Sequence, residues 1–485
     1  MNIIDPILFQ SSLQPKAAAI CAPGSALGLI SYGRLAQHVH NICRALRSVG
    51  LGSGKTVAVS IGDPIFHVAV TLSLMRLGIV TVSKYDERIL QAVKLDVLIA
   101  DKPPTSAKID QIILADLSWT RGDGDPLEPN EIPVTAPDDI CRIILTSGST
   151  GDPKAVAFSH NMLVDRVYQQ IIAFGSRVAN CSRIYSDLPI STMPGLRMLL
   201  LTLWRGGIFF FPGDTFESTV NAFEEYQVQC ILSSPGGLEA MLKGYQRYPT
   251  LRSQIEVIVV PGAVLPKALA DSVCARICSH AVTDYGATEM GPSASAPVQL
   301  LSDIPGAVGF ATPGVTVEIV NDAGQQVPVG AEGYVRIKSQ YLARQYVGDP
   351  QASAKAFRDG YFYPGDIGAL DATNLLRIVG RQDTIFNLGG DKINPETIDR
   401  VVASCAGVVE CASFGAPDEF GIDTVWVALV VDESLDDKQL QAHCEANLPA
   451  QFQPAKFIRV EQLPRNDMGK VDRKRLLEVV VARTI

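Results

Sequence analysis

The stretch from Leu145 to Lys154, which reads LTSGSTGDPK, constrains the fold more than any other part of the chain. A short apolar strand is predicted directly before it, at 141–145, and a helical pattern begins after Ser159. Glycines and small hydroxyl side chains let backbone N–H groups approach an anion closely, and the lysine adds a positive charge. No Gly-Lys-Ser/Thr follows at the Walker A spacing, so a phosphate-binding loop of another kind is predicted. Taken alone, such a run is also typical of an ordinary turn.

The length and charge of the chain limit what it can be. Its 485 residues exceed what one hydrophobic core normally serves, so we expect two or more domains. Hydrophobic residues make up 47% and charged residues 19%, which is typical of a globular protein. The formal net charge is −9 and no basic stripe is visible, so we expect no nucleic-acid partner. Any anionic ligand must therefore be bound by local groups.

The cysteines and the apolar segments indicate a cytoplasmic protein without a membrane span. The ten cysteines form no Cys-x-x-Cys motif. Neither of the two close pairs, Cys274 with Cys278 and Cys405 with Cys411, comes with histidines at metal-ligand spacing, so we expect reduced thiols. The first ten residues contain Asp5 and lack a basic segment, which argues against a secretory signal. The most apolar region, at 198–213, is interrupted by Arg205 and predicts a buried helix followed by a buried strand.

Strands and helices are predicted to alternate near the N-terminus. Leu35, Val39, Ile42 and Leu46 recur at helical spacing, and Gly50 follows them as a stop signal. Buried strands are then expected at 56–61, 79–83 and 95–100, with a helix at 67–78. Such alternation predicts an α/β fold with a largely parallel sheet.

The residue order in LTSGSTGDPK closely resembles the phosphate loop of the adenylate-forming superfamily, which contains acyl- and aryl-CoA ligases, carrier-protein-loading adenylation domains and luciferases. The resemblance extends over essentially the whole chain, at 31–476, with the motifs in the family's order. It implies a large N-terminal domain of α/β subdomains with a small β-rich portion, plus a small α+β C-terminal domain. The residues implied to bind the phosphates of ATP are Thr146, Ser147, Gly148, Ser149, Thr150, Gly151 and Lys154.

The segment at 282–289 matches the family's Tyr-Gly-x-Thr-Glu motif. Tyr285 offers an aromatic face on which adenine can stack, and Thr288 offers a hydroxyl to the α-phosphate. Glu289 offers a hard oxygen to Mg²⁺ and is the expected metal ligand. Asp284 is expected at the adenine amino group. The other implied adenine-site residues are Gly286 in this motif, and Gly262 and Ala263 in a small turn that follows an earlier strand.

Two further motifs imply the ribose site and a hinge. Asp366 ends a sequence that resembles aromatic-x-Thr-Gly-Asp, with Pro364 in place of Thr, and its carboxylate is expected to bind both ribose hydroxyls. The Gly-Arg-x-Asp motif implies that Arg381 reaches the ribose and that Asp383 is the hinge pivot. The implied domains are residues 1–380, which bind ATP and the acid, and residues 381–485, which move.

The C-terminal part supplies the remaining implied groups. Lys470 lies in a Gly-Lys-x-x-Arg sequence that matches the family's last motif, so it is the expected catalytic lysine, together with Thr288 and Glu289 from the earlier motif. Gly389 and Gly390 match a glycine-containing loop that lines the pantetheine tunnel in CoA ligases. In the family, rotation about the hinge exchanges the lysine for this loop between the two half-reactions.

The acid pocket is expected to begin at 188–195. Related CoA ligases commonly read Pro-x-x-His-x-x-Gly there, and Thr192 stands in the histidine's place, so the usual gate is missing. Met193 lies near the position where amino-acid-activating domains carry an aspartate, which argues against a free α-amino acid; ordinary core packing is the alternative. Gly236 is the third expected pocket residue. Arg197 is expected to be a solvated helix residue, with pairing to a second substrate carboxylate as the alternative.

Together the motifs imply an ATP-dependent acid–thiol ligase. A carboxylate attacks the α-phosphate of ATP to give an acyl-adenylate and pyrophosphate, and a thiol then takes the acyl group and releases AMP. The expected ligands are a small carboxylic acid, ATP, Mg²⁺ and CoA. The alternative thiol is the phosphopantetheine of a separate carrier protein, because no Gly-x-Asp-Ser-Leu-like attachment site follows Lys470. A third hypothesis is a non-catalytic nucleotide-binding relative, against which intact Lys154, Glu289, Asp366 and Lys470 argue.

Overall fold

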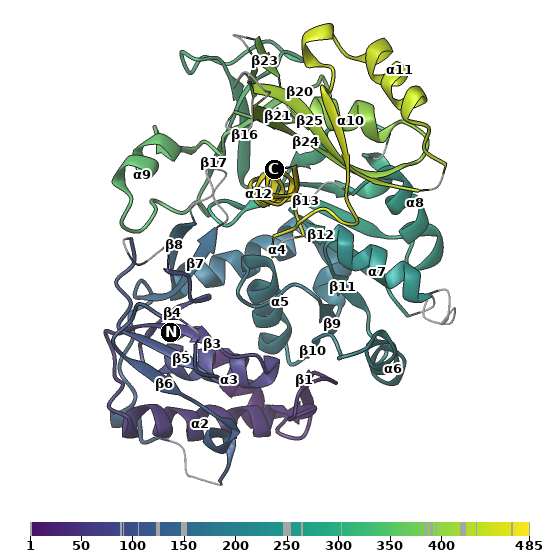
Figure 1. The fold of residues 1–485 in the computed structure, drawn as a ribbon. Coiled ribbons are helices and arrows are strands. Elements are labelled where there is room, and N and C mark those ends of the chain that lie inside the picture. The colour runs from purple at the N-terminus through teal and green to yellow at the C-terminus, as the bar shows by residue number, and fades with distance from the viewer. Residues whose placement is uncertain are drawn as a thin grey trace. The chain divides into compact units, whose positions relative to one another are not determined.

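Figure 1 shows the fold of the chain as a computed structural model. It describes residues 2–87, 90, 92–104, 106–122, 127–146, 153–245, 254–262, 265–301, 303–382, 386–388, 391–393, 395–417, 423–432, 434–466 and 469–484. Contacts divide the chain into two compact units: the first comprises Met1–Ser147, Asp152–Thr316 and Ile337–Phe362, and the second includes Val317–Arg336 and Tyr363–Ile485. The domain boundary predicted at residue 381 is a hinge about which the C-terminal domain would move. The division by contacts does not test that motion, so this boundary stays a prediction.

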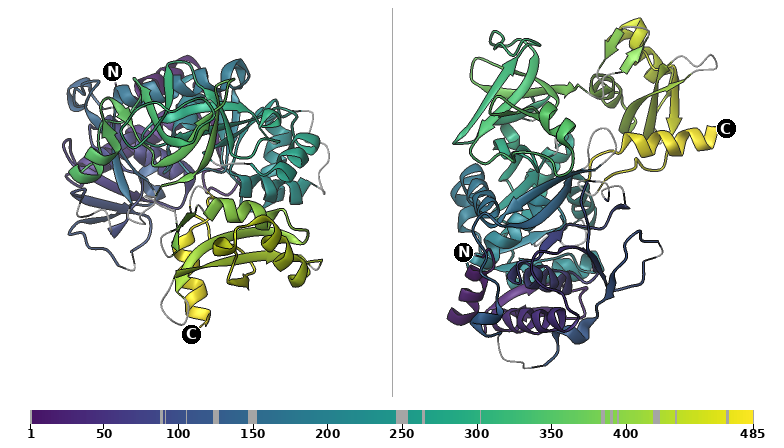
Figure 2. Two further views of the ribbon diagram at one scale, coloured as in Figure 1. Left: turned by 90° about the horizontal axis from the view of Figure 1, so that it is seen from above. Right: turned by 90° about the vertical axis from the view of Figure 1, so that its left-hand side faces the viewer.

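The N-terminal sheet of the first unit has the strand order β6-β5-β3-β4-β7-β8. Its strands are β3 (Thr56–Ser60), β4 (Val80–Val82), β5 (Val97–Ala100), β6 (Ile112–Leu114), β7 (Ile140–Thr146) and β8 (Lys154–Ser159). The pairs from β6 to β7 are parallel and the pair β7–β8 is antiparallel. α3 (Pro64–Arg76) packs against β3 and β4, and α2 (Tyr32–Ser48) lies beside α3 (Figures 1 and 2). The near-continuous apolar runs of β3 and β5 suit strands that are covered on both faces.

A second sheet of the first unit runs in the order β2-β1-β10-β9-β11-β12-β13-β14-β15. Its strands are β1 (Ala18–Cys21), β2 (Leu29–Ser31), β9 (Arg183–Ser186), β10 (Ile208–Phe210), β11 (Cys230–Leu232), β12 (Val257–Pro261), β13 (Ala281–Ala287), β14 (Gly291–Pro297) and β15 (Ala307–Ala311). From β1 to β13 the pairs are parallel, and β13, β14 and β15 pair antiparallel. Parallel strands end at the same edge of a sheet, which brings the ends of β9, β11, β12 and β13 together.

The remaining helices of the first unit begin at clear sequence signals. α4 (His160–Asn180) and α5 (Met193–Trp204) are capped by the hydroxyls of Ser159 and Thr192, which accept N–H groups from the first turn. The others are α1 (Asp5–Leu13), α6 (Phe216–Tyr226), α7 (Pro235–Tyr245), α8 (Lys267–Arg276) and α9 (Pro350–Ala356). β18 (Phe357–Arg358) and β19 (Tyr361–Phe362) form a short antiparallel pair after α9.

The second unit contains an antiparallel ladder and a three-stranded sheet covered by helices. In the ladder, β20 (Asp366–Leu370) pairs with β17 (Gly333–Ser339) and with β21 (Leu375–Arg381), and β16 (Val315–Val320) pairs with β17. The sheet contains β24 (Val408–Pro417), β25 (Asp423–Val431) and β26 (Lys456–Arg459). The other elements are β22 (Phe386–Leu388), β23 (Asp391–Ile393), α10 (Pro395–Ala403), α11 (Asp437–Asn447) and α12 (Arg473–Thr484).

Alternation along β25 explains how this small unit is held together. Val425, Val427 and Leu429 pack in one cluster with α10 and α11, whereas Trp426 and Ala428 pack in another with α12. Successive residues of a strand point to opposite faces, so one strand contributes to both cores. This arrangement confirms the α/β fold class with a small α+β C-terminal part. Within the described part of the chain, no helix is long and apolar enough to cross a membrane.

Replacement of Leu476 by alanine tests the packing of α12. The side chain is fully buried against the three-stranded sheet, so Leu476→Ala should lower the free energy of unfolding by about 2–5 kcal/mol. Urea denaturation followed by circular dichroism measures this, with exposed Glu478→Ala on the same helix as the control. Equal stability of the two variants would contradict the packing described for α12.

Candidate active site

β7 and β8 hold the two ends of the predicted phosphate loop. In their antiparallel pairing, Thr146 lies opposite Lys154. Both residues are half-buried, and the preceding residues of β7 are buried, so core packing fixes the base of the loop. The other residues predicted to bind phosphate, which lie outside the described residues, are Ser147, Gly148, Ser149, Thr150 and Gly151.

The Tyr-Gly-x-Thr-Glu motif begins on β13 and ends in the turn to β14. Asp284 and Glu289 are 5% and 6% exposed, whereas Tyr285, Gly286 and Thr288 are half-buried. The register of the β13–β14 pair shifts between Tyr285 and Gly286. A Cβ on Gly286 would lie 2.5 Å from a backbone oxygen of β14, so only glycine fits this close approach. The motif therefore contains two buried carboxylates, one on β13 beside the predicted adenine-stacking residue in the sequence and one in the turn that follows.

Both carboxylate oxygens of Asp284 have partners. Arg197 Nη2 donates to Oδ2 at 2.9 Å, and the backbone N–H of Gly262 donates to Oδ1 at 2.8 Å. The side chains of Arg197 and Asp284 are 4% and 3% exposed. The expectation that Arg197 is solvated is therefore wrong, because α5 turns this residue towards β13. Gly262 is thereby fixed in its turn with a φ of +66°, while the contact of Asp284 with adenine stays a prediction. Ala263 lies outside the described residues.

Arg166 on α4 holds the backbone of the turn between β13 and β14, and the sequence did not indicate this role. Its Nη2 donates to the carbonyl oxygens of Thr288 and Glu289 at 3.1 and 2.9 Å. Gln169 holds the same turn further along, because its Nε2 donates to the carbonyl oxygens of Met290 and Pro292 at 3.1 and 3.2 Å. Burial is the main reason that the pKa of Arg166 falls to about 9.

A sequence signal that Arg166 is buried does exist. Arg166 falls in the same helical stripe as the buried apolar residues Leu163, Val167 and Phe174. Long polar side chains on the apolar stripe of a helix must find buried partners, because an unpaired polar group costs free energy. The stripe alone, however, does not say which distant turn supplies those partners.

Glu289 is tied down at its side chain as well as at its backbone. The hydroxyl of Tyr346 donates to Glu289 Oε1 at 2.7 Å, and the backbone N–H of Ala343 donates to the Glu289 carbonyl oxygen at 2.7 Å. Lys154 Nζ lies 4.9 Å from the centre of the Tyr346 ring. The structure therefore brings Lys154 and Glu289, from two separate motifs, to one tyrosine.

The carboxylate of Glu289 suits Mg²⁺. The described residues contain no group of three or more histidine, cysteine or carboxylate side chains that could hold a metal ion. Mg²⁺ commonly takes one or two carboxylates and completes its octahedron with substrate phosphates and water. A single buried carboxylate, oriented by one hydrogen bond, matches that requirement.

The predicted acid-pocket residues play three different roles. The hydroxyl of Thr192 donates to the Pro189 carbonyl oxygen at 2.8 Å and accepts the N–H of Gly195 at 3.3 Å, so it caps α5. Met193 is 2% exposed and packs in the core. At Gly236, a Cβ would meet no heavy atom within 4 Å, which leaves open space beside the start of α7. Their contact with an acid stays a prediction.

The second unit brings the two predicted ribose residues together. Asp366 and Arg381 lie opposite each other in the β20–β21 pair, and Arg381 Nη1 donates to Asp366 Oδ1 at 3.2 Å. Lys470 is exposed in a tight turn, where its backbone N–H donates to Asn466 Oδ1 at 3.1 Å. The hinge residue Asp383 and the tunnel residues Gly389 and Gly390 lie outside the described residues.

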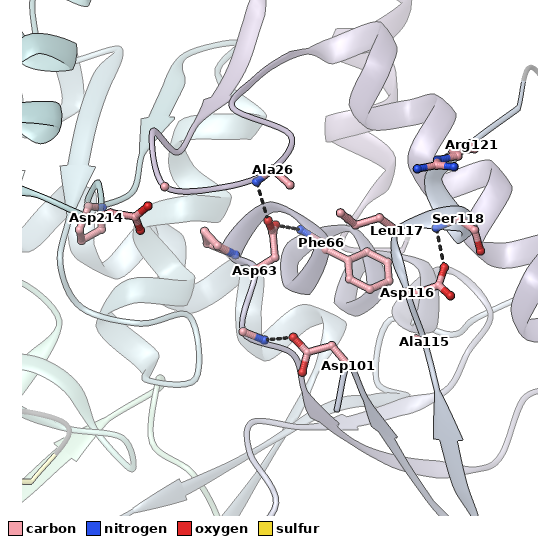
Figure 3. Close-up of a pocket in the computed structure, with 14 residues that line it drawn as sticks. Ala26, Asp63, Phe66, Asp101, Ala115, Asp116, Leu117, Ser118, Arg121 and Asp214 are labelled. Carbon is pink, nitrogen blue, oxygen red and sulfur yellow. Dashed lines mark hydrogen bonds between the residues drawn. The ribbon is translucent and has the colours of Figure 1, made fainter. Parts of the chain in front are cut away.

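A separate cavity of about 840 Å³ lies at the carboxyl ends of β3, β5, β6 and β10 in the first unit. Figure 3 shows that three of its aspartates accept hydrogen bonds from nearby backbone N–H groups: Asp63 from Ala26 and Phe66, Asp101 from Gly62, and Asp116 from Ser118. These bonds hold local turns together. The residues that line the cavity do not include the predicted site residues.

Removal of Arg197 tests the buried ion pair. Arg197→Ala leaves Asp284 buried without its cation, so the free energy of unfolding should fall by about 3–5 kcal/mol. The exposed pair Arg459–Asp437 is the matched control, and Arg459→Ala should cost less than about 1 kcal/mol. Urea denaturation measures both. A loss for Arg197→Ala no greater than that of the control would contradict the role given to the pair.

Comparison with known proteins agrees with this geometry. Residues 10–347 match the AMP-binding enzyme family, and residues 397–470 match the AMP-binding enzyme C-terminal domain. The 4-chlorobenzoate–CoA ligase of an Arthrobacter species is 26% identical over 98% of this chain and 95% of its own length. The indoleacetate–CoA ligase of Aromatoleum aromaticum is 27% identical over 100% and 99%.

Solved structures share the fold. O-succinylbenzoate coenzyme A synthetase from Bacillus subtilis, solved in complex with ATP and a magnesium ion, superimposes with a TM-score of 0.82. The similarity covers 97% of this chain and 99% of that one at 20% sequence identity, which speaks for the fold alone. The first match includes the segments at 145–154 and 282–289, and the second match ends at Lys470. The chain therefore belongs to the AMP-binding enzyme family.

Proposed function

We propose that this protein is an AMP-forming acid–CoA ligase, which activates a carboxylic acid with ATP and transfers the acyl group to CoA. The observation that carries this proposal is the end-to-end similarity to proteins named CoA ligases, which covers at least 95% of both lengths in the two relatives described above. The buried, oriented Glu289 and the nearby Lys154 support it, because phosphate chemistry needs fixed charges of both signs.

In the first half-reaction, the chain has to orient the acid and the triphosphate and to offset the charge that develops. Tyr285 is half-buried on β13 and supplies a face for adenine, while Asp366 supplies an acceptor for the ribose hydroxyls. Mg²⁺, when bound at Glu289, neutralises phosphate charge. Lys154 guides pyrophosphate, and Lys470 bridges the carboxylate and the α-phosphate.

In the second half-reaction, the roles belong to the C-terminal part of the chain. Rotation about Asp383 withdraws Lys470 and brings the loop with Gly389 and Gly390 to the thiol path. Lys470 is exposed in its turn, which suits a side chain that must enter and leave a site. Exclusion of water matters here, because the acyl-adenylate is a mixed anhydride that hydrolyses.

We propose an aromatic monocarboxylic acid as the substrate class. Both relatives described above are named for aromatic acids. A Cβ at Gly236 would meet no heavy atom within 4 Å, which leaves room beside the start of α7, and Met193, which packs in the core, supplies no carboxylate to pair with an α-ammonium group. A second carboxylate is disfavoured, because Arg197 is already neutralised by Asp284.

A panel of acids tests the substrate class. With ATP, Mg²⁺ and CoA, aryl acids should give acyl-CoA with a kcat/KM about tenfold or more above long-chain and dicarboxylic acids, because a pocket discriminates by the fit of apolar groups. Acyl-CoA is measured by liquid chromatography and mass spectrometry. Thioester formed best from a long-chain or dicarboxylic acid would contradict the proposed class. A single burst of pyrophosphate that is indifferent to CoA would instead favour a carrier protein as the acceptor.

Replacement of Lys470 tests the first half-reaction. Lys470→Ala should lower the rate of acyl-adenylate formation about a hundredfold or more, since it removes a charge placed at the transition state, while ATP binding and the fold persist. Exposed Lys438→Ala in the same unit is the control and should behave as the wild type. Adenylation by Lys470→Ala at the wild-type rate would contradict the role assigned to this lysine.

A further inference from the structure

Tyr346 contacts functional side chains of two separate motifs. Its hydroxyl donates to Glu289 Oε1 at 2.7 Å, and Lys154 Nζ lies 4.9 Å from the centre of its ring. Tyr346 and Glu289 are 5% and 6% exposed, so the hydrogen bond between them is shielded from water, while Lys154 is half-buried. Building on the proposed function, we propose that Tyr346 is a positioning residue, which holds Glu289 and Lys154 in the arrangement that binds the Mg²⁺–triphosphate.

The segment that carries Tyr346 is joined to the backbone of both motifs. The N–H of Ala343 donates to the carbonyl oxygen of Glu289 at 2.7 Å, and the N–H of Val347 donates to the carbonyl oxygen of Ala155, next to Lys154, at 2.8 Å. Residues on either side of the tyrosine are therefore anchored to the two elements that its side chain touches. These two hydrogen bonds fix the distance between the β7–β8 pair, here called the phosphate-loop hairpin, and the turn between β13 and β14.

The tyrosine itself has little freedom. Its backbone N–H donates to the hydroxyl of Ser353 at 2.9 Å. Its ring packs edge-on against Phe357, with 5.3 Å between the ring centres. A side chain whose rotamer is set by such contacts can orient a neighbour without first losing conformational entropy of its own.

The hydroxyl and the ring of Tyr346 contact side chains of opposite charge, Glu289 and Lys154, and each group interacts favourably with its partner. The hydroxyl donates to an anion and so restricts rotation of the Glu289 carboxylate, which leaves the second oxygen to face a cation. The ring presents its negative face to the ammonium of Lys154 and limits the swing of a long, flexible side chain. One residue thereby orients both the carboxylate that would hold Mg²⁺ and the lysine predicted to guide pyrophosphate.

Tyr346→Phe separates the two contacts, because it removes the hydroxyl and keeps the ring. We expect the Mg²⁺ concentration that gives half-maximal adenylation to rise about tenfold, the effect of losing one hydrogen bond to a charged group, with the KM for the acid unchanged. Tyr346→Leu removes the ring as well, so the KM for ATP should rise in addition. Tyr334→Phe is the matched control, since Tyr334 donates to Asp322 at 2.9 Å on an exposed surface.

A measurement without turnover accompanies the kinetics. The melting temperature is recorded with ATP plus EDTA and with ATP plus Mg²⁺, and the difference between the two is the Mg²⁺-dependent stabilisation. Tyr346→Phe should lose most of this difference, whereas Tyr334→Phe should keep it. A variant that melts lower but keeps the wild-type Mg²⁺ response in both assays would show a purely structural role and overturn the proposal.

The same experiments distinguish a failure of the ligase assignment from a failure of the inference about Tyr346. If the wild type and Tyr334→Phe convert no acid to adenylate, the ligase assignment fails, while the melting temperatures still decide whether Tyr346 positions the metal ligand. If the melting temperature of the wild type with ATP does not respond to Mg²⁺, the inference about Tyr346 is overturned as well.

Discussion

Two buried carboxylates, those of Asp284 and Glu289, determine how the first unit is assembled around β13. Charged groups can be buried only where partners compensate them. Asp284 receives Arg197 from α5 and the N–H of Gly262 from the end of β12, and Glu289 receives the hydroxyl of Tyr346. Segments distant in the sequence are therefore brought to one strand and its turn, which carry the motif predicted to bind the nucleotide.

The arginines of this region hold structure rather than substrate. Arg166 donates to backbone carbonyl oxygens of the turn after β13, and Arg197 lies in a buried ion pair. Two arginines thus stand beside two carboxylates, and the pKa of Arg166 is lowered mainly by burial and by the charge of Arg197. A rigid, preorganised turn favours phosphoryl chemistry, because charges that are already in place need no reorganisation during the reaction.

The sequence predicted the parts of this site that are local. Alternating strands and helices predicted the α/β class, and the strand predicted at 56–61 appears as β3. The buried helix and the buried strand predicted within 198–213 appear as part of α5 and as β10. Residue order identified the motif at 282–289 and the pair Asp366 and Arg381, which the structure places in contact. The roles of the residues in these motifs stay predictions.

Contacts between distant segments were beyond the sequence. Arg197 looks like a solvated helix residue until α5 is placed against β13. Tyr346 belongs to no motif that sequence reasoning selected, because its importance comes from the side chains it touches. The periodicity of a sequence indicates which face of a helix is buried. It does not indicate which group on another element is the partner of a polar side chain on that face.

Acid-dependent exchange of labelled pyrophosphate into ATP, measured without CoA, tests the central claim most directly. The exchange reports reversible formation of the acyl-adenylate, which is the step that the β13 turn and the phosphate-loop hairpin are proposed to support. The account predicts exchange that requires Mg²⁺ and an aromatic acid and that needs no thiol. Absence of exchange with every acid in the presence of Mg²⁺, or exchange without any acid, would contradict it.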